Sequence, residues 1–297
     1  MILTFTLSSY HLEYFISRSF VVQWIKNEVH MNIQIEDKRI LDVLNNSVID
    51  TFEFGSKIYG LDTQNSDIDD IAVVKQNDFF ANTFLWEHHT IQRASKERDT
   101  IYTTLQLLVR NLMTGDSTAY FETLHSNQCK GTILEFLADR KTWFYNFTTI
   151  RSFLGYARRD IKHSKDNGKR FAHAVRCYYA AKMLFEDNFY TNDYREYNHA
   201  IYNYILAAKL GTHGLSKYEM SQEIQYYKKA IDDLRKEVSN SFNSNQRRYN
   251  RYMSVERLRE IDAYVIDKNK SLWYDLEDKE FYINQMYHAL ENGVEYG

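Results

Sequence analysis

The feature that most constrains this chain is a pair of short apolar segments joined by a polar loop, between residues 52 and 74. The first segment ends at Gly55-Ser56, and the second begins at Asp67-Ile68-Asp69 and continues as Ile-Ala-Val-Val. Glycine, asparagine and serine in the loop are typical turn residues, so the pattern predicts two β-strands with a tight connection. Side chains two residues apart share one face of a strand, which places Asp67 beside Asp69.

This pair of carboxylates predicts a metal ion. Two carboxylates a few ångströms apart repel each other and one pKa rises, unless a cation neutralises them. Carboxylate oxygens are hard ligands that suit Mg²⁺ or Mn²⁺. Gly55 lets the backbone approach a ligand closely, and a helical turn from Lys57 to Tyr59 would direct free N–H groups at an anion. The sequence therefore predicts phosphate beside metal.

The spacing of these residues resembles the nucleotidyltransferase motif of the DNA polymerase β superfamily, in which Gly-Ser precedes Asp-x-Asp on the next strand. The fuller pattern Gly-Ser-x-x-Tyr-Gly-x-x-Thr-x-x-Ser-Asp-x-Asp is similar to that of the predicted nucleotidyltransferases of bacteria and tailed phages. One departure is Asp70, where the superfamily more often has an apolar residue. In a regular strand Asp70 faces away from Asp67 and Asp69, so we expect a supporting or edge position. An acidic turn between two ordinary strands is the alternative interpretation.

The resemblance implies a third carboxylate on a neighbouring strand, which helps to hold one metal ion and accepts the proton of the attacking hydroxyl. Asp99 is the predicted residue, with Glu97 and Glu87 as alternatives. The sequence from Asp99 to Tyr102, leading into a helix from Thr103 to Met113, is similar to the continuation of the family motif. Asp99 could also be a helix N-cap, and the two roles are compatible.

A basic stripe is predicted further along the chain. On a helix Lys169, His173 and Arg176 fall at positions i, i+4 and i+7, which lie on one face. The family pattern Lys-x-x-Ala-His-x-x-Arg, after a Gly-Tyr helix matched by Gly155-Tyr156, extends the resemblance. Such a stripe facing acidic metal ligands would bind triphosphate or nucleic-acid phosphate, with Lys57 as a further candidate. The alternatives are a solvated basic face, ion pairs with Glu122, and a packing role for His173.

Composition limits the class of protein. The 297 residues are 44% hydrophobic and 15% aromatic, which is typical of globular protein, and the net charge of −3 excludes a globally basic surface. Cys129 and Cys177 are far apart in sequence and have no zinc-ligand or disulfide pattern, which fits a reducing cytoplasm. Because the chain has neither a run of 18 apolar residues nor a signal-peptide pattern, we expect neither membrane spanning nor secretion.

The pattern of apolar residues predicts an α+β fold: a mixed sheet of the nucleotidyltransferase type flanked by helices, followed by a helical domain, with the active site in the cleft between them. The predicted divisions are an N-terminal extension (1–30), a catalytic domain (31–148), a helical domain (149–238) and a basic loop with a helical tail (239–297). Helices are predicted over 36–46, 131–137, 149–163, 194–210 and 216–238, and a strand over 88–93. The tail is expected to dock on the helical bundle or on a second subunit.

Taken together, the resemblance implies transfer of a nucleoside monophosphate from an NTP such as ATP to an acceptor hydroxyl, with release of pyrophosphate. Asp67, Asp69 and Asp99 would hold two metal ions, and Gly55-Ser56 would bind the β- and γ-phosphates. The acceptor stays open between tRNA or other RNA, a protein and a small molecule, as do the base preference and the oligomeric state. The alternative is a nucleic-acid or protein binding module that keeps the fold without the activity.

Overall fold

The computed structural model describes residues 33–34, 45–63, 66–75, 91–94, 98–165, 167–244 and 255–268. The predicted N-terminal extension (1–30) lies outside the described residues. So does most of the helix predicted over 36–46, of which residues 45 and 46 are described and helical.

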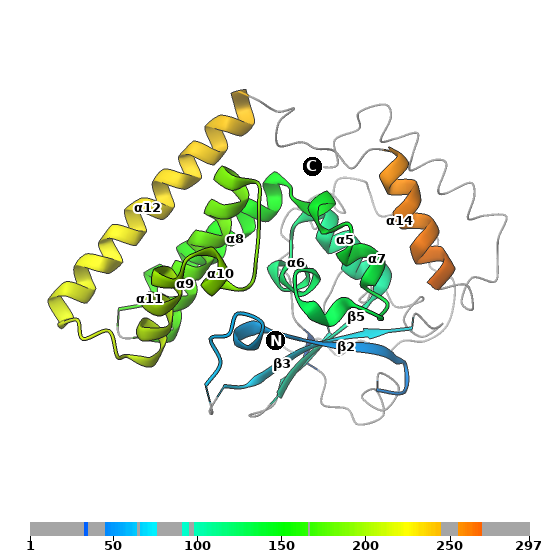
Figure 1. The fold of residues 1–297 in the computed structure, drawn as a ribbon, viewed down its shortest axis with the longest axis horizontal. Coiled ribbons are helices and arrows are strands. Elements are labelled where there is room, and N and C mark those ends of the chain that lie inside the picture. The colour runs from blue at the N-terminus through cyan, green and yellow to red at the C-terminus, as the bar shows by residue number, and fades with distance from the viewer. Residues whose placement is uncertain are drawn as a thin grey trace, which may run out of the picture.

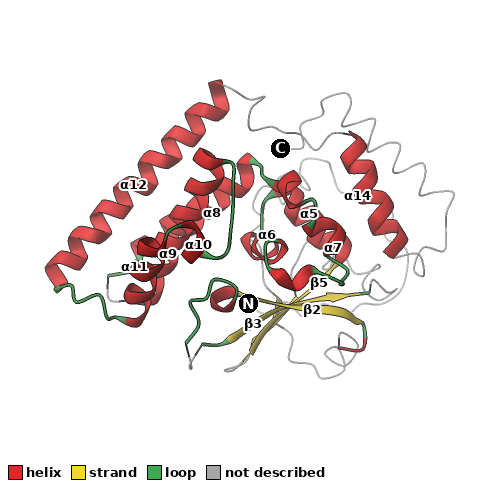
Figure 2. Ribbon diagram, viewed as in Figure 1, coloured by secondary structure: helices red, strands yellow, loops and turns green. Residues whose placement is uncertain are grey.

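The described strands form one five-stranded mixed sheet with the order β1-β4-β5-β3-β2. Its three long members are β2 (Val48–Phe54), β3 (Ile68–Val74) and β5 (Arg98–Thr104), and the short ones are β1 (Ile33–Gln34) and β4 (Ile91–Ala94). Strand β3 runs antiparallel to β2 and parallel to β5. Figure 2 shows the strands gathered below the helices. The predicted mixed sheet is confirmed, and the two strands on either side of the 55–67 loop are those that the sequence pattern indicated.

Strand β5 corrects one prediction. Residues Arg98–Thr104 form a strand, and the helix α5 (Leu105–Thr114) begins after Thr104, whose side-chain Oγ1 accepts a hydrogen bond from the Leu107 N–H at 3.2 Å. Asp99 is therefore not a helix N-cap, and Tyr102 belongs to the strand. The β-branched and aromatic residues from Thr100 to Thr104 explain the difference, because they favour extended backbone despite the apolar helical spacing that follows.

Helices cover the sheet and continue into a helical layer (Figure 1). Near the sheet lie α5, α6 (Thr118–Leu124) and the short α7 (Glu135–Ala138). The layer consists of α8 (Phe147–Lys162), α9 (Gly168–Lys182), α10 (Tyr194–Tyr197), α11 (His199–Leu210) and α12 (Lys217–Ser244). Helix α9 packs on α8 and α11, and α12 packs on α8. The α+β class with a following helical region is thus confirmed, and buried side chains of both regions belong to one continuous core.

The C-terminal part differs from the prediction in two ways. Helix α12 continues to Ser244, so residues 239–244 are helical and not the start of a loop, while residues 245–254 lie outside the described part. Helix α14 (Val255–Lys268), the described part of the tail, contacts α7 and the turn after it: the Tyr264 and Phe136 rings stack with centroids 4.4 Å apart, and the Arg140 Nε lies 3.6 Å from the Glu260 Oε2. A periodic apolar face predicts that a helix docks, but not where.

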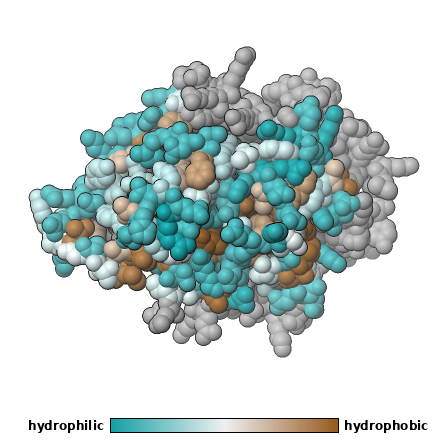
Figure 3. Space-filling view, in the orientation of Figure 1, coloured by the Kyte–Doolittle hydropathy of each residue, from teal (hydrophilic) through white to brown (hydrophobic). Residues whose placement is uncertain are grey.

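The visible surface is mainly hydrophilic, with small scattered apolar areas (Figure 3). Within the described ranges, every helix is too short or too polar to cross a lipid bilayer.

Candidate active site

Strand register brings together two carboxylates that lie far apart in the sequence. In the parallel pair of β3 and β5, Asp69 is the register partner of Asp99. Asp67 immediately precedes β3 and lies on the same face as Asp69, because strand side chains alternate. The structure therefore places all three predicted carboxylates at one edge of the sheet, which we call the acidic edge (Asp67, Asp69 and Asp99). The alternatives Glu97 and Glu87 lie outside the described residues.

The acidic edge gathers negative charge. The pKa of Asp69 is raised to about 6: burial is the largest cause, repulsion from Asp99 and then Asp67 adds to it, and Lys169 opposes the change. Asp67 is the most open of the three, with a side chain 49% exposed.

The Gly-Ser turn lies directly against this edge. Strand β2 ends at Phe54, the register partner of Asp69, and Gly55–Lys57 then form a single 3₁₀ turn. Gly55 has a φ of 70°, and a Cβ placed there would lie 2.4 Å from the Asp69 Oδ2. Any side chain at position 55 would thus displace the carboxylate, so glycine is required for two reasons at once. No side chain caps the start of this turn.

The donor set fits a divalent cation. Within the described part of the chain, no three acidic, histidine or cysteine side chains are grouped closely enough to hold a metal ion. The acidic edge offers hard oxygen donors on adjacent strands, and repulsion from Asp99 and Asp67 adds to burial in raising the pKa of Asp69. A cation bound among them would remove that repulsion, and all-oxygen sites are those that Mg²⁺ and Mn²⁺ prefer.

Two lysines from the helical layer face the acidic edge. The Lys169 Nζ lies 3.7 Å from the Asp67 Oδ2, as part of the predicted basic stripe. Lys209, at the end of α11, was not predicted from the sequence. Burial, followed by repulsion from Lys169, lowers the pKa of Lys209, whereas Asp62, Asp67 and Asp69 raise it.

The two lysines meet because α9 begins against the end of α11. A Cβ at Gly168 would lie 2.3 Å from the Ala208 carbonyl oxygen, so only glycine permits this approach. Lys209 precedes the C-cap Gly211 by two residues and donates a hydrogen bond to the Leu61 carbonyl at 2.6 Å. Nothing in the local sequence around Lys209 indicates this contact, because it joins residues 148 positions apart.

The loop between the Gly-Ser turn and Asp67 is held from the helical layer. The Tyr202 hydroxyl donates to the Gly60 carbonyl at 2.8 Å, next to the contact that Lys209 makes with Leu61. Inside the loop, the Ser66 Oγ accepts from the Thr63 N–H at 2.9 Å. These bonds fix the approach of the chain to Asp67.

The remaining members of the basic stripe lie elsewhere. Arg176 is 3% exposed, forms an ion pair with Glu122, and stacks its guanidinium 4.0 Å from the centroid of the Tyr59 ring. The Tyr59 hydroxyl also donates to Glu122. This is the ion-pair alternative left open by the sequence, and it removes Arg176 from contact with a phosphate at the acidic edge.

His173 belongs to the same network. Its Nδ1 lies 2.6 Å from the Asp160 Oδ2, and the Arg176 Nη2 lies 3.0 Å from its Nε2. Arginine can only donate, so Nε2 accepts and Nδ1–H donates to Asp160. We call Tyr59, Glu122, Asp160, His173 and Arg176 the buried polar cluster; it joins the sheet region to the helical layer, and its histidine takes the packing role.

Two other predicted residues have local partners. The Lys57 Nζ lies 2.6 Å from the Oε1 of Glu53, which is four residues earlier in β2, so Lys57 forms a local ion pair. Asp70 faces away from the acidic edge, as its alternation predicts, but it is 1% exposed and forms an ion pair with Arg98. It is therefore a buried residue and not an edge residue.

Comparison with protein-family models and with curated proteins gave no match for this chain.

Proposed function

We propose that this protein is a metal-dependent nucleotidyltransferase, which moves a nucleoside monophosphate from an NTP to an acceptor hydroxyl and releases pyrophosphate. The observation that carries the proposal is the register of Asp69 with Asp99, beside Asp67 and against the Gly55-Ser56 turn. Carboxylates from two strands and a glycine turn for phosphate are the parts that this chemistry needs.

Each residue has a distinct part in the proposed reaction. Asp67, Asp69 and Asp99 would hold Mg²⁺ or Mn²⁺, which when bound supplies the positive charge that phosphoryl chemistry requires. Asp99 accepts the proton of the attacking hydroxyl. The backbone of Gly55-Ser56 binds the terminal phosphates of the donor, and Ser56 adds a hydroxyl to this contact.

Lys169 and Lys209 complete the site from the opposite side. Both ammonium groups lie within the electrostatic field of Asp67 and Asp69, so they favour a ligand that brings negative charge to the same place. An NTP with its metal ion has that character. The helical layer therefore contributes charge to a donor whose main contacts come from the sheet.

The test is turnover of α-³²P-labelled NTP by the wild type and by Asp69→Asn, with all four nucleotides and with RNA or cell lysate as acceptor. Loss of one charged ligand should reduce the rate roughly a thousandfold or more, because phosphoryl transfer depends on positioning and charge. The matched control is Asp116→Asn, an exposed acid that follows α5 and lies outside the acidic edge, which should retain at least about half of the rate. Equal rates in Asp69→Asn and wild type would contradict the proposal.

Mg²⁺-dependent NTP binding separates this function from a binding module without activity. A catalytic site predicts that Mg²⁺ strengthens NTP binding and that Asp69→Asn abolishes the increase. Binding that is indifferent to Mg²⁺ would favour the module.

A further inference from the structure

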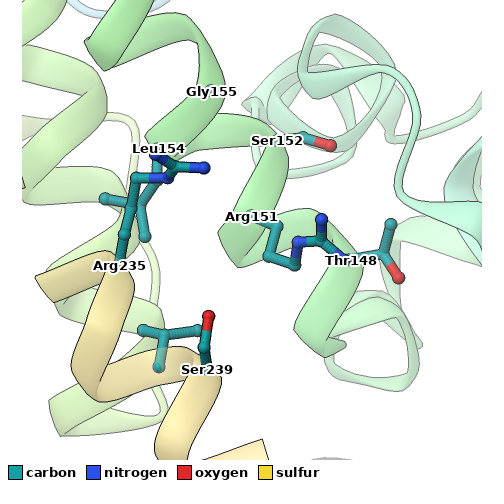
Figure 4. A pocket seen from close by; sticks show the side chains of 8 residues that line it. Thr148, Arg151, Ser152, Leu154, Gly155, Arg235 and Ser239 are labelled. Carbon is teal, nitrogen blue, oxygen red and sulfur yellow. The ribbon is translucent and has the colours of Figure 1, made fainter. Parts of the chain in front are cut away.

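A groove runs along the seam between α8 and α12, apart from the acidic edge. Its first part is a cavity of about 390 Å³, bordered by Arg151 and Gly155 on α8 and by Arg235 and Ser239 on α12. A neighbouring cavity of about 670 Å³ shares Arg235 and Ser239 with the first and extends it past Arg158. Figure 4 shows the side chains of both helices around the first cavity. We call the combined hollow the α8–α12 groove.

The helical period explains why these residues face one hollow. On α8, Arg151, Gly155 and Arg158 are at positions i, i+4 and i+7, which form one stripe. On α12, Asp232, Arg235, Lys236 and Ser239 have the same relation. The two stripes meet where the helices pack, so the basic side chains gather along one line.

The groove has an excess of positive charge. Four basic side chains border it, and the acidic residue among its lining residues is Asp232. The Asp232 Oδ1 lies 3.6 Å from the Arg158 Nε and 3.9 Å from the Arg235 Nη1, so one carboxylate is shared by two guanidinium groups.

The other two basic residues are open to solvent. The Lys236 side chain is 76% exposed, with its Nζ 3.9 Å from Asp233. Arg151 is exposed and lies over the Phe147 ring, with 5.6 Å from its guanidinium carbon to the ring centroid, and it has no ion pair among the described residues. These donors are available to an anion.

Glycine at position 155 keeps the floor of the groove open. It lies inside α8, where glycine is unfavourable because it loses the most backbone freedom. A Cβ there would have no neighbouring atom within 4 Å, so packing does not require the absence of a side chain. At this one position of the stripe, between Arg151 and Arg158, α8 has no side chain.

We propose that the α8–α12 groove binds the sugar-phosphate backbone of a polynucleotide. The α8 stripe spans about 10 Å, from seven residues at about 1.5 Å each, which suits successive phosphates better than a single anion. Arginine forks bind phosphate oxygens in pairs, and the lining offers too few apolar side chains for an apolar partner.

The groove is a site of its own. Neither the carboxylates of the acidic edge nor Lys169 and Lys209 are among the residues that line the groove. An NTP at the acidic edge is therefore not the ligand of the groove. The proposal concerns polynucleotide binding alone, so its test does not depend on whether the protein turns over NTP.

The test is fluorescence anisotropy of a labelled 20-nucleotide RNA, without NTP or metal ion, at several salt concentrations. Reversal of two charges in Arg151→Glu/Arg235→Glu should weaken binding roughly tenfold or more. It should also reduce the slope of log affinity against log salt by about 1.4, because single strands contribute about 0.7 per phosphate contact. Gly155→Glu adds a negative charge where a side chain meets no obstruction, and it should weaken binding roughly threefold or more.

The matched control is Lys130→Glu/Lys217→Glu, which makes the same charge change on exposed residues outside the groove, and which should keep the wild-type affinity within about twofold. Thermal unfolding of each variant establishes that it is folded. Equal binding by wild type and Arg151→Glu/Arg235→Glu, or by wild type and Gly155→Glu, would overturn the proposal. Absence of RNA binding by the wild type would do so too. Tripolyphosphate that displaces the RNA at equal phosphate concentration would instead identify a small-anion site, and would also overturn it.

Discussion

The acidic edge and the buried polar cluster use the same kinds of side chain for opposite purposes. In the cluster, Glu122 and Arg176 are almost fully buried and neutralise each other. At the edge, Asp69 is half-buried beside Asp67 and Asp99, and repulsion from both adds to burial in raising its pKa. The paired charges of the buried polar cluster stabilise the fold where water is excluded. The carboxylates of the acidic edge repel one another at a solvent-accessible place, and such a group is suited to binding a ligand.

The largest expected difference in stability comes from breaking the central ion pair of the cluster. Glu122→Leu leaves the Arg176 guanidinium buried without its carboxylate, which should cost about 3–5 kcal/mol in the free energy of unfolding. Glu122→Leu/Arg176→Met removes both charges and should recover part of that loss. Urea denaturation measures both variants.

The acidic edge provides the matched control for that experiment. Asp67→Asn removes a carboxylate whose contact with Lys169 is long and solvent-exposed, so its unfolding free energy should change by less than about 1 kcal/mol. If Glu122→Leu proved as mild as Asp67→Asn, the contrast between the two regions would disappear.

Asp160 tests the outer end of the cluster and its pH dependence. Burial would raise the pKa of Asp160, but hydrogen bonds from His173 and Arg159 outweigh it and hold the pKa below its ordinary value. A lowered pKa stabilises the folded state above the unfolded value near 4, and this contribution is lost as the pH falls. Asp160→Asn should cost about 2 kcal/mol at pH 7, and wild type and variant should converge below pH 4. A constant difference from pH 7 to pH 3 would show that the carboxylate charge is not what stabilises.

The smallest expected effect has the opposite sign and belongs to the acidic edge. Because the pKa of Asp69 is raised to about 6, its ionised form destabilises the folded chain above that pH. Without divalent cations, Asp69→Asn should be more stable than the wild type by about 1 kcal/mol at pH 8, a reduced value because the carboxyl is only half-buried. The difference should vanish near pH 4. Differential scanning fluorimetry at both pH values measures it.

Addition of Mg²⁺ should then reverse the order of the two proteins. A cation that binds only the folded state stabilises the wild type by mass action, and Asp69→Asn lacks one of its proposed ligands. If Mg²⁺ stabilised both proteins equally, the raised pKa of Asp69 would have to be explained without metal binding at the acidic edge.

The sequence predicted what depends on local spacing. The strand period alone places Asp67 beside Asp69, and the helical period alone places Lys169, His173 and Arg176 on one face. Which neighbours those faces meet depends on tertiary packing. Arg176 therefore lies against Glu122 and Tyr59, while Lys169, one end of the same stripe, lies near Asp67.

The start of the helix after Asp99 and the role of Lys209 both depend on tertiary contacts that local spacing does not reveal. Asp99 was predicted on a strand next to that of Asp69, as the register shows, but a helix N-cap stayed open as a second role and the helix was expected from Thr103, because the apolar spacing there suits either structure. Lys209 had no local signal at all, since its role depends on the close approach of α11 to the start of α9.

The bonds from Tyr202 and Lys209 to the carbonyls of Gly60 and Leu61 have a consequence for dissection of the chain. A fragment that stops before residue 147 would retain every carboxylate of the edge, but it would lose both hydrogen bonds that support the loop leading to it. The Tyr59 ring would also lose the Arg176 guanidinium that covers it. The sheet region therefore depends on the helical layer for the conformation of this loop, and results obtained with an isolated sheet fragment should not be transferred to the intact protein.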